Sequence, residues 1–214
     1  MYAAKVKRIL DILERMYPDA ECALVHRNNY ELIVAVALSA QTTDKSVNKI
    51  TPELFKAYPT TEALAKADVN DVMDIIHTIG MYKVKSKNII ALANKLQIDY
   101  GGDVPSSYEE LESLPGVGRK TANVVRAVGF NIPSLAVDTH VFRVANRMQL
   151  AVGTTPDSVE KGLQKAIPVE WWSRAHHWLI WHGRRICKAR KPLCEDCFQN
   201  DICPSSTVRV HSIH

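Results

Sequence analysis

The chain has 214 residues, of which 46% are hydrophobic and 23% charged, and its formal net charge is +4. This is the composition of an ordinary globular protein of one domain or two small ones, and the mild basic charge permits a polyanionic partner without requiring one. Lys5, Lys7, Arg8 and Asp11 interrupt the apolar N-terminal residues, which excludes a signal-peptide core. No run approaches the ~18 apolar residues of a membrane span. We therefore expect a cytoplasmic protein with no membrane contact and with reduced thiols.

Apolar residues recur at helical spacing along most of the chain. The first stripe, over 6–16, ends before Pro18. The run YELIVAVALSA at 30–40 could be a buried strand or a buried helix by its period alone, but its length and its alanines favour a helix. This start of the chain is therefore expected to be helical.

The polar interruption QTTD follows that run. Thr43 or Asp44 is expected to be an N-cap, and Pro52 is expected in the first turn of the next helix. Because no strand pair and no repeat is evident, the sequence predicts an all-α fold. Further helices are predicted at about 61–67, 69–77, 83–99, 107–113, 119–129, 139–148, 156–166 and 170–186.

The stretch LPGVGRKTANVV at 114–125 places Gly116 and Gly118 before a small-residue helix. A nucleotide-binding P-loop is excluded because Arg119 stands where its lysine belongs. A dinucleotide-binding loop is excluded because Thr121 stands where its third glycine belongs and because the preceding residues have helical spacing. The spacing alone is equally compatible with an ordinary turn between helices and with a phosphate-binding hairpin.

Four of the five cysteines fall within 17 residues, with the spacing C-x6-C-x2-C-x5-C. These four are Cys187, Cys194, Cys197 and Cys203. The spacing indicates a metal site, either zinc or a 4Fe–4S cluster, whereas the distant Cys22 is expected to be a small buried apolar residue. The run GRRICKARK at 183–191 carries five positive charges and no acid. Such a run is usually a solvated surface, but a metal in the same loop would hold its charges in a defined array.

Several motifs occur together in one order. The hairpin LPGVGRKTANVV is followed by VDTHVFRV at 137–144 and by the cysteine pattern, and ALSAQTTD, TIGMY and HHWLIWHGR complete the set. Together they closely resemble the endonuclease III family of helix-hairpin-helix DNA glycosylases over nearly the whole chain. The resemblance implies two helical lobes, one formed by 23–133 with the hairpin, and one formed by 1–22 plus 134–214 with a C-terminal 4Fe–4S cluster loop. DNA would bind across the groove between them.

The resemblance also implies an activity. It is that of a bifunctional DNA glycosylase and abasic-site lyase, which removes oxidised pyrimidines from duplex DNA and cuts the strand by β-elimination. Lys120 matches the family's catalytic lysine, which forms a Schiff base with the sugar; the helix dipole and partial burial are expected to lower its pKa. Asp138 matches the catalytic carboxylate, and its position also suits an N-cap.

The resemblance implies DNA contacts as well. Gln41 and Met81 would fill the gap left by the extruded nucleotide, although the family usually has leucine at the Met81 position. His140 is either a lesion contact or an ordinary histidine of a capped helix. The full set of expected DNA-binding residues is Gln41, Met81, Gly116, Val117, Gly118, His140, Arg184, Lys188, Arg190 and Lys191.

The cofactor implied is a 4Fe–4S cluster rather than zinc. The partner implied is double-stranded DNA with damaged pyrimidines or abasic sites, and a bacterial, nucleoid-associated monomer is expected. One alternative is an adenine-removing relative, but such proteins generally lack a lysine at this site and carry a large extra C-terminal domain, whereas 11 residues follow Cys203. A second is a non-catalytic helix-hairpin-helix iron–sulfur DNA-binding protein, which would not require Lys120 and Asp138. A third, a metal site at His176, His177 and His182, is less favoured than buried or hydrogen-bonded histidines.

Overall fold

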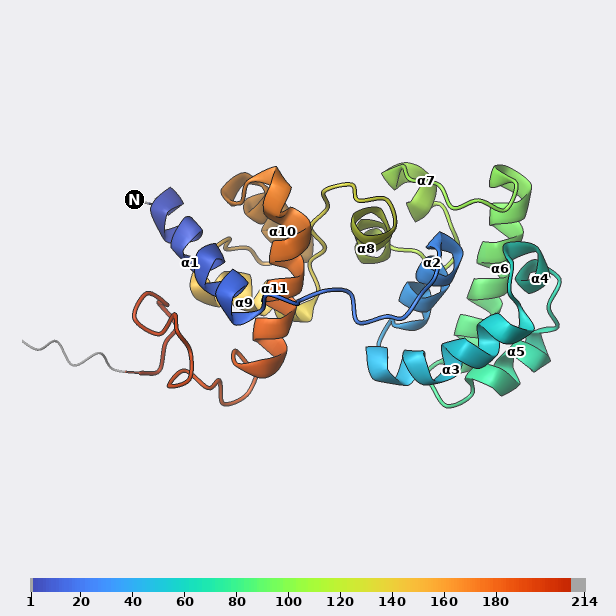
Figure 1. The fold of residues 1–214 in the computed structure, drawn as a ribbon, viewed down its shortest axis with the longest axis horizontal. Coiled ribbons are helices and arrows are strands. Elements are labelled where there is room, and N and C mark those ends of the chain that lie inside the picture. Colours follow the sequence, from blue (N-terminus) through green and yellow to red (C-terminus); the bar gives the residue numbers. More distant parts are fainter. Residues whose placement is uncertain (1, 209–214) are drawn as a thin grey trace, which may run out of the picture. The chain divides into compact units, whose positions relative to one another are not determined.

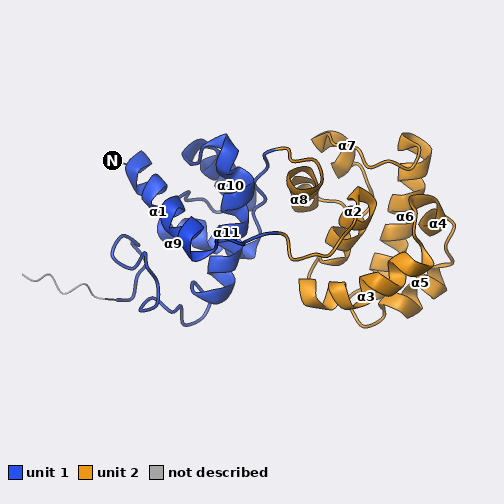
Figure 2. Ribbon diagram, viewed as in Figure 1, with its two compact units in different colours: residues 1–21, 133–214 blue, residues 22–132 orange. Residues whose placement is uncertain are grey.

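The structure, a computed structural model, describes residues 2–208 of the chain. The chain divides into two compact units, shown in Figure 2. Unit 1 consists of Met1–Glu21 and Pro133–His214, and unit 2 consists of Cys22–Ile132. All regular elements within residues 2–208 are helical, which confirms the all-α fold class. None of the helices in this range is both long enough and apolar enough to cross a membrane.

Unit 2 is built around α2, the helix of the nearly all-apolar run (Figure 1). Every residue of α2 after its first is buried, and the helix packs against α3, α6 and α8. A helix that is apolar on all sides requires this burial on all sides, so the helical interpretation of the run is confirmed. The helices of unit 2 are α2 (Asn29–Leu38), α3 (Asp44–Ala57), α4 (Thr61–Ala65), α5 (Val69–Ile76), α6 (Tyr82–Tyr100), α7 (Tyr108–Glu112) and α8 (Arg119–Gly129).

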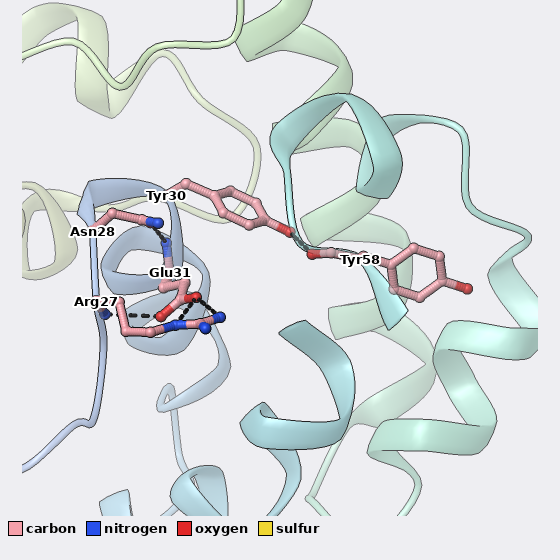
Figure 3. A network of polar contacts seen from close by, with 5 residues as sticks. All are labelled: Arg27, Asn28, Tyr30, Glu31 and Tyr58. Atoms are coloured by element: carbon pink, nitrogen blue, oxygen red, sulfur yellow. Dashed lines mark hydrogen bonds and ion pairs between the residues drawn. The ribbon is translucent and has the colours of Figure 1, made fainter. Parts of the chain in front are cut away.

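Polar contacts hold the first turn of α2 in place (Figure 3). The Asn28 side chain caps the helix by accepting a hydrogen bond from the Glu31 backbone N–H at 2.9 Å. The buried Glu31 carboxylate in turn accepts hydrogen bonds from the backbone N–H and the guanidinium of Arg27. Tyr30 donates its hydroxyl to the carbonyl of Tyr58 at 2.8 Å, which ties α2 to the end of α3. The buried charge is therefore paired, as burial requires.

Helix α3 corrects one prediction. Pro52 does not lie in the first turn of a separate helix; it lies in the middle of α3. An interior proline costs about 3 kcal/mol because it removes one backbone hydrogen bond and crowds the preceding turn. The buried stripe of Val47, Ile50 and Leu54 runs through the proline at helical spacing. We infer that burial of this stripe offsets the cost and keeps the helix continuous.

Unit 1 packs α1 and α9 against α11. The apolar stripe of α1 is confirmed, since Val6, Ile9 and Leu13 are buried in the core of this unit, together with the fully buried Trp178 of α11. The elements of unit 1 are α1 (Tyr2–Met16), α9 (Thr139–Met148), α10 (Pro156–Ala166), the 3₁₀ turn η1 (Val169–Trp171) and α11 (Trp172–Arg185).

Candidate functional site

The hairpin lies in unit 2, between α7 and α8. Gly116 has a φ of +76°, and a Cβ at this position would lie 3.2 Å from Cβ of Asn88, so both the backbone and the packing require glycine. Gly118 differs, because its φ of −104° is open to any residue and an added Cβ would meet no atom within 4 Å. Of the two glycines, only Gly116 is therefore required by the turn itself. Gly118 instead leaves open space beside the first amides of α8.

Val117 lies between the two glycines, and both its side chain and its backbone N–H make contacts inside the protein. Its side chain is buried, and its N–H donates to the carbonyl of Leu114 at 3.1 Å. This amide is therefore engaged within the hairpin. The first N–H groups of α8 lie at the positive end of the helix dipole.

Lys120 is the second residue of α8, directly after the hairpin turn. Its side chain is exposed, so the expectation of partial burial is wrong. The reason is its place in the first turn, because the buried residues of α8 begin at Ala122. Arg119 and Arg126 both lie over the ring of Tyr108, at 5.1 and 5.7 Å from its centroid, and so fasten α8 to α7. The lysine is therefore carried on a helix whose first turn is anchored from a neighbouring helix.

Asp138 lies in unit 1 at the N-terminus of α9. Its Oδ1 atom accepts hydrogen bonds from the backbone N–H groups of His140 and Val141, both at 2.8 Å, which confirms the predicted N-cap. A carboxylate in this place is stabilised by the positive end of the helix dipole. Both interactions favour the ionised form of the side chain.

His140 follows in the first turn of α9 and is partly buried. Burial lowers the pKa of its imidazole below the ordinary value, which favours a neutral ring, and its Nδ1 lies 3.1 Å from the guanidinium of Arg143. Gly183 of α11 passes so close that an added Cβ would lie 2.9 Å from Cβ of His140. The glycine thus allows α11 to approach the helix that carries Asp138 and His140.

Gln41 and Met81 lie in two turns of unit 2. Each has a left-handed backbone, with φ of 54° and 60°, and each side chain is exposed. A left-handed non-glycine residue costs about 1 kcal/mol or more, and such residues are concentrated at functional sites. Met81 is also one of the large apolar side chains left in solvent, 55% exposed.

The cysteine pattern converges on one site in unit 1. All four cysteines of the pattern line one partly open cavity: Cys187, Cys194, Cys197 and Cys203. Within residues 2–208, no three His, Cys, Asp or Glu side chains are placed to hold one metal ion. The four sulfur donors around one cavity fit a group that takes four thiolate ligands, such as a 4Fe–4S cluster.

Two arginines of α9, Arg143 and Arg147, contact the start of the cysteine loop. This name denotes residues 187–203, which carry the four cysteines. Arg143 Nε donates to the carbonyl of Cys187 at 3.0 Å. Arg147 donates to the carbonyls of Lys188 and Ala189 at 2.7 and 3.1 Å, and lies 3.4 Å from the Cys187 sulfur. Neither arginine is predicted from the sequence. Their spacing of four residues on a helix places them on one face, but the carbonyls that they bind are about 40 residues away.

Two histidines of α11, His176 and His182, are buried and hydrogen-bonded. His176 lies 2.8 Å from the carbonyl of Ala136. His182 lies 3.1 Å from the Tyr17 hydroxyl and 3.7 Å from the Cys197 sulfur, and burial lowers the pKa of its imidazole to about 4. The preference for buried, hydrogen-bonded histidines is confirmed for His176 and His182.

The basic side chains of the run at 183–191 are exposed along the end of α11 and the cysteine loop. Lys191 adopts a left-handed backbone with a φ of 50°. Arg185 is already engaged, because its guanidinium lies 4.0 Å from the ring centroid of Trp181. The exposed basic residues that were expected to contact DNA are Arg184, Lys188, Arg190 and Lys191.

Comparison with known proteins identifies the family. Residues 34–169 match the model of the HhH-GPD superfamily of base excision DNA repair proteins. The chain is 48% identical over 203 residues to endonuclease III of Rickettsia felis, with 95% of each chain covered. It is 46% identical over 203 residues to endonuclease III of Escherichia coli K12, with 95% of this chain and 96% of the relative covered.

A solved structure of a trapped endonuclease III–DNA covalent intermediate is also similar. It superposes with a TM-score of 0.91 and 44% identity, over 95% of this chain and 96% of that chain. The chain therefore belongs to the endonuclease III family of the HhH-GPD superfamily, and it is a DNA glycosylase and abasic-site lyase of base excision repair.

Proposed function

We propose that this enzyme removes oxidised pyrimidines from double-stranded DNA through a Schiff base on Lys120 and then cuts the strand by β-elimination. The observation that carries the proposal is the exposed lysine in the first turn of α8, directly after the hairpin. A relative with 44% identity has been trapped as a covalent intermediate with DNA. An amine that can reach a sugar carbon is the group that such an intermediate requires.

The hairpin and the cysteine loop would hold the DNA backbone. The open space beside Gly118 and the positive end of the α8 helix dipole suit a phosphate oxygen. Arg184, Lys188, Arg190 and Lys191 would neutralise further phosphates. Such contacts position the enzyme on the duplex without reading its sequence, as a repair enzyme with dispersed targets requires.

The damaged nucleotide must leave the stack before its C1′ atom can be reached, as in glycosylases generally. Gln41 and Met81 would enter the gap, since both are exposed on left-handed turns of unit 2. His140, whose partial burial favours the neutral ring, would offer a hydrogen bond to the extruded base. These roles support selection for damage, because a damaged base costs less to extrude.

The chemical steps would then be carried by Lys120 and Asp138. The neutral amine of Lys120 forms a bond to C1′ while the glycosidic bond breaks, and the base leaves with the electron pair and is protonated. Loss of the sugar ring C–O bond converts the adduct to an imine. The imine acidifies the C2′ proton, and loss of that proton expels the 3′ phosphate and cuts the strand.

Asp138 would act both before the base leaves and while it leaves. Its ionised carboxylate would assist deprotonation of Lys120 and stabilise the positive charge that develops on the sugar. The cap supports the second role, because two amides and the helix dipole favour the anion. The capping role and the catalytic role can therefore coexist in one side chain.

The four cysteines would hold a 4Fe–4S cluster. When bound, the cluster cross-links the loop through four iron–thiolate bonds, and the chemical steps are assigned to Lys120 and Asp138 alone. The cavity that all four cysteines line supports this cofactor, as does the contact of Arg147 with the Cys187 sulfur, because a cation stabilises a thiolate. The loop would then present its basic residues as a defined array.

Protein purified without oxygen should contain about four irons and about four sulfides per chain. Cys194→Ser should lose most of both, because one thiolate ligand is missing. The measurement is an assay of iron and acid-labile sulfide, with Cys22→Ser as the matched control, since Cys22 belongs to unit 2. One zinc per chain with no labile sulfide would reject the cluster.

Turnover of a defined duplex tests the function. A duplex with a single thymine glycol should be cut at the lesion, leaving an unsaturated sugar on the 3′ end of one fragment and a phosphate on the 5′ end of the other. A denaturing gel resolves these products, and a duplex with adenine opposite 8-oxoguanine is the control. Release of adenine without cleavage at the oxidised pyrimidine would reverse the substrate assignment.

A further inference from the structure

Two turns of unit 2 share an unusual property. Gln41 lies between α2 and α3, Met81 lies immediately before α6, and both residues have a left-handed backbone and an exposed side chain. Each conformation is unfavourable for a residue with a Cβ, so the surrounding structure must hold it. Two such turns in one unit raise the question of what holds them.

A single buried side chain links the two turns. Lys85 lies in the first turns of α6, is 6% exposed, and donates from Nζ to Thr42 Oγ1 at 2.7 Å. Thr42 is the residue next to Gln41, and the N–H of Lys85 donates to the carbonyl of Met81 at 3.0 Å. This hydrogen bond therefore joins Thr42, the neighbour of Gln41, to Lys85, which lies one helical turn after Met81. The two bonded residues are 43 positions apart in the sequence.

Burial of the Lys85 side chain carries a desolvation cost that an apolar side chain would not have. Burial lowers its pKa, and its Nζ donates to the neutral hydroxyl of Thr42. Burial of a charged group is usually no more stabilising than burial of an apolar side chain of similar size. What a directed hydrogen bond adds is a defined register between the two elements that it joins.

We propose that Lys85 and Thr42 are positioning residues, whose hydrogen bond holds the turns of Gln41 and Met81 in one array so that both side chains enter the DNA gap together. The inference rests on the proposed gap-filling role of Gln41 and Met81. It assigns a purpose to a buried lysine that the chemical steps do not use. It also explains why the lysine lies one helical turn after Met81.

The threonine provides a matched pair of variants. Thr42→Val has nearly the same shape and removes the hydroxyl, whereas Thr42→Ser keeps it; Lys85→Met removes the donor from the other side. Thr42→Val and Lys85→Met should each lower the affinity for a duplex with a tetrahydrofuran abasic analogue by about 5- to 10-fold, the usual value of one buried hydrogen bond. Thr42→Ser should retain most of the affinity.

Three further measurements separate positioning from folding. Affinity for the undamaged duplex and borohydride trapping on single-stranded abasic DNA should be unchanged in Thr42→Val, since neither presents a gap in a stack. The double variant Thr42→Val/Lys85→Met should be no weaker than the worse single variant, because both remove the same hydrogen bond. A loss that is equal on undamaged and abasic duplex would overturn the proposal.

The variants Gln41→Ala and Met81→Ala test the role on which the proposal rests. If both lower the affinity for the abasic duplex and Thr42→Val does not, the positioning role is wrong and the gap-filling role stands. If neither lowers it, the gap-filling role is wrong and the positioning role falls with it. The enzymatic activity on a thymine glycol duplex is read separately, so neither result is confused with loss of the catalytic function.

Discussion

Lys120→Gln should form no covalent adduct with DNA under conditions in which the unaltered enzyme forms one readily. Borohydride reduces an imine between a lysine and C1′ to a stable amine, and the amide of glutamine cannot form that imine. The substrates are a thymine glycol duplex and a duplex with an abasic site. The measurement is the fraction of labelled DNA that migrates with the protein on a denaturing gel, and we expect this fraction to fall to the background.

The same variant should still fold and bind DNA. Lys120 is exposed, and the substitution removes a cation from a helix N-terminus, so stability should change by less than about 1 kcal/mol. The turn at Gly116 and the basic cysteine loop are untouched, so affinity for the abasic analogue should be retained. Trapping at the level of the unaltered enzyme would mean that another amine is the nucleophile.

The local features of this fold could be read from the sequence because neighbouring residues set them. Asp138 caps α9 as predicted, and of the two candidates Thr43 and Asp44 the cap of α3 is Thr43. Helix α8, predicted at about 119–129, runs over Arg119–Gly129. The predicted position of Pro52 is wrong because the prediction relied on the preference of proline for the start of a helix. The buried stripe of α3 continues through Pro52 instead. At this position tertiary packing outweighs the low helix propensity of proline.

The long-range features could not be read in this way. The exposure of Lys120 depends on where the buried face of α8 begins, and partial burial was wrongly expected. The contacts of Arg147 with the cysteine loop and of Lys85 with Thr42 join residues about 40 positions apart. Such pairs leave no periodic signal in one sequence. A lysine in an otherwise helical stripe is usually solvated, and only the structure distinguishes Lys85 from that case.

Asp138→Asn should slow base release by about 10²- to 10⁴-fold, the usual contribution of a positioned acid or base. The substitution isolates the charge, because the asparagine Oδ1 can still accept the hydrogen bonds that Asp138 takes from His140 and Val141. Folding and DNA affinity should therefore be close to those of the unaltered enzyme. The rate is measured by single-turnover release of the base from a thymine glycol duplex.

Asp138→Ala is the matched control, because it removes the charge and the cap together. Loss of an N-cap costs about 1 kcal/mol of stability, so this variant should unfold at a lower temperature while its base release is slowed as much as that of Asp138→Asn. On an abasic duplex, where no base has to leave, both variants should lose less activity than on the lesion. If Asp138→Asn releases the base at the parent rate and only Asp138→Ala is slow, the carboxylate serves α9 as a cap and the charge takes no part in the chemistry.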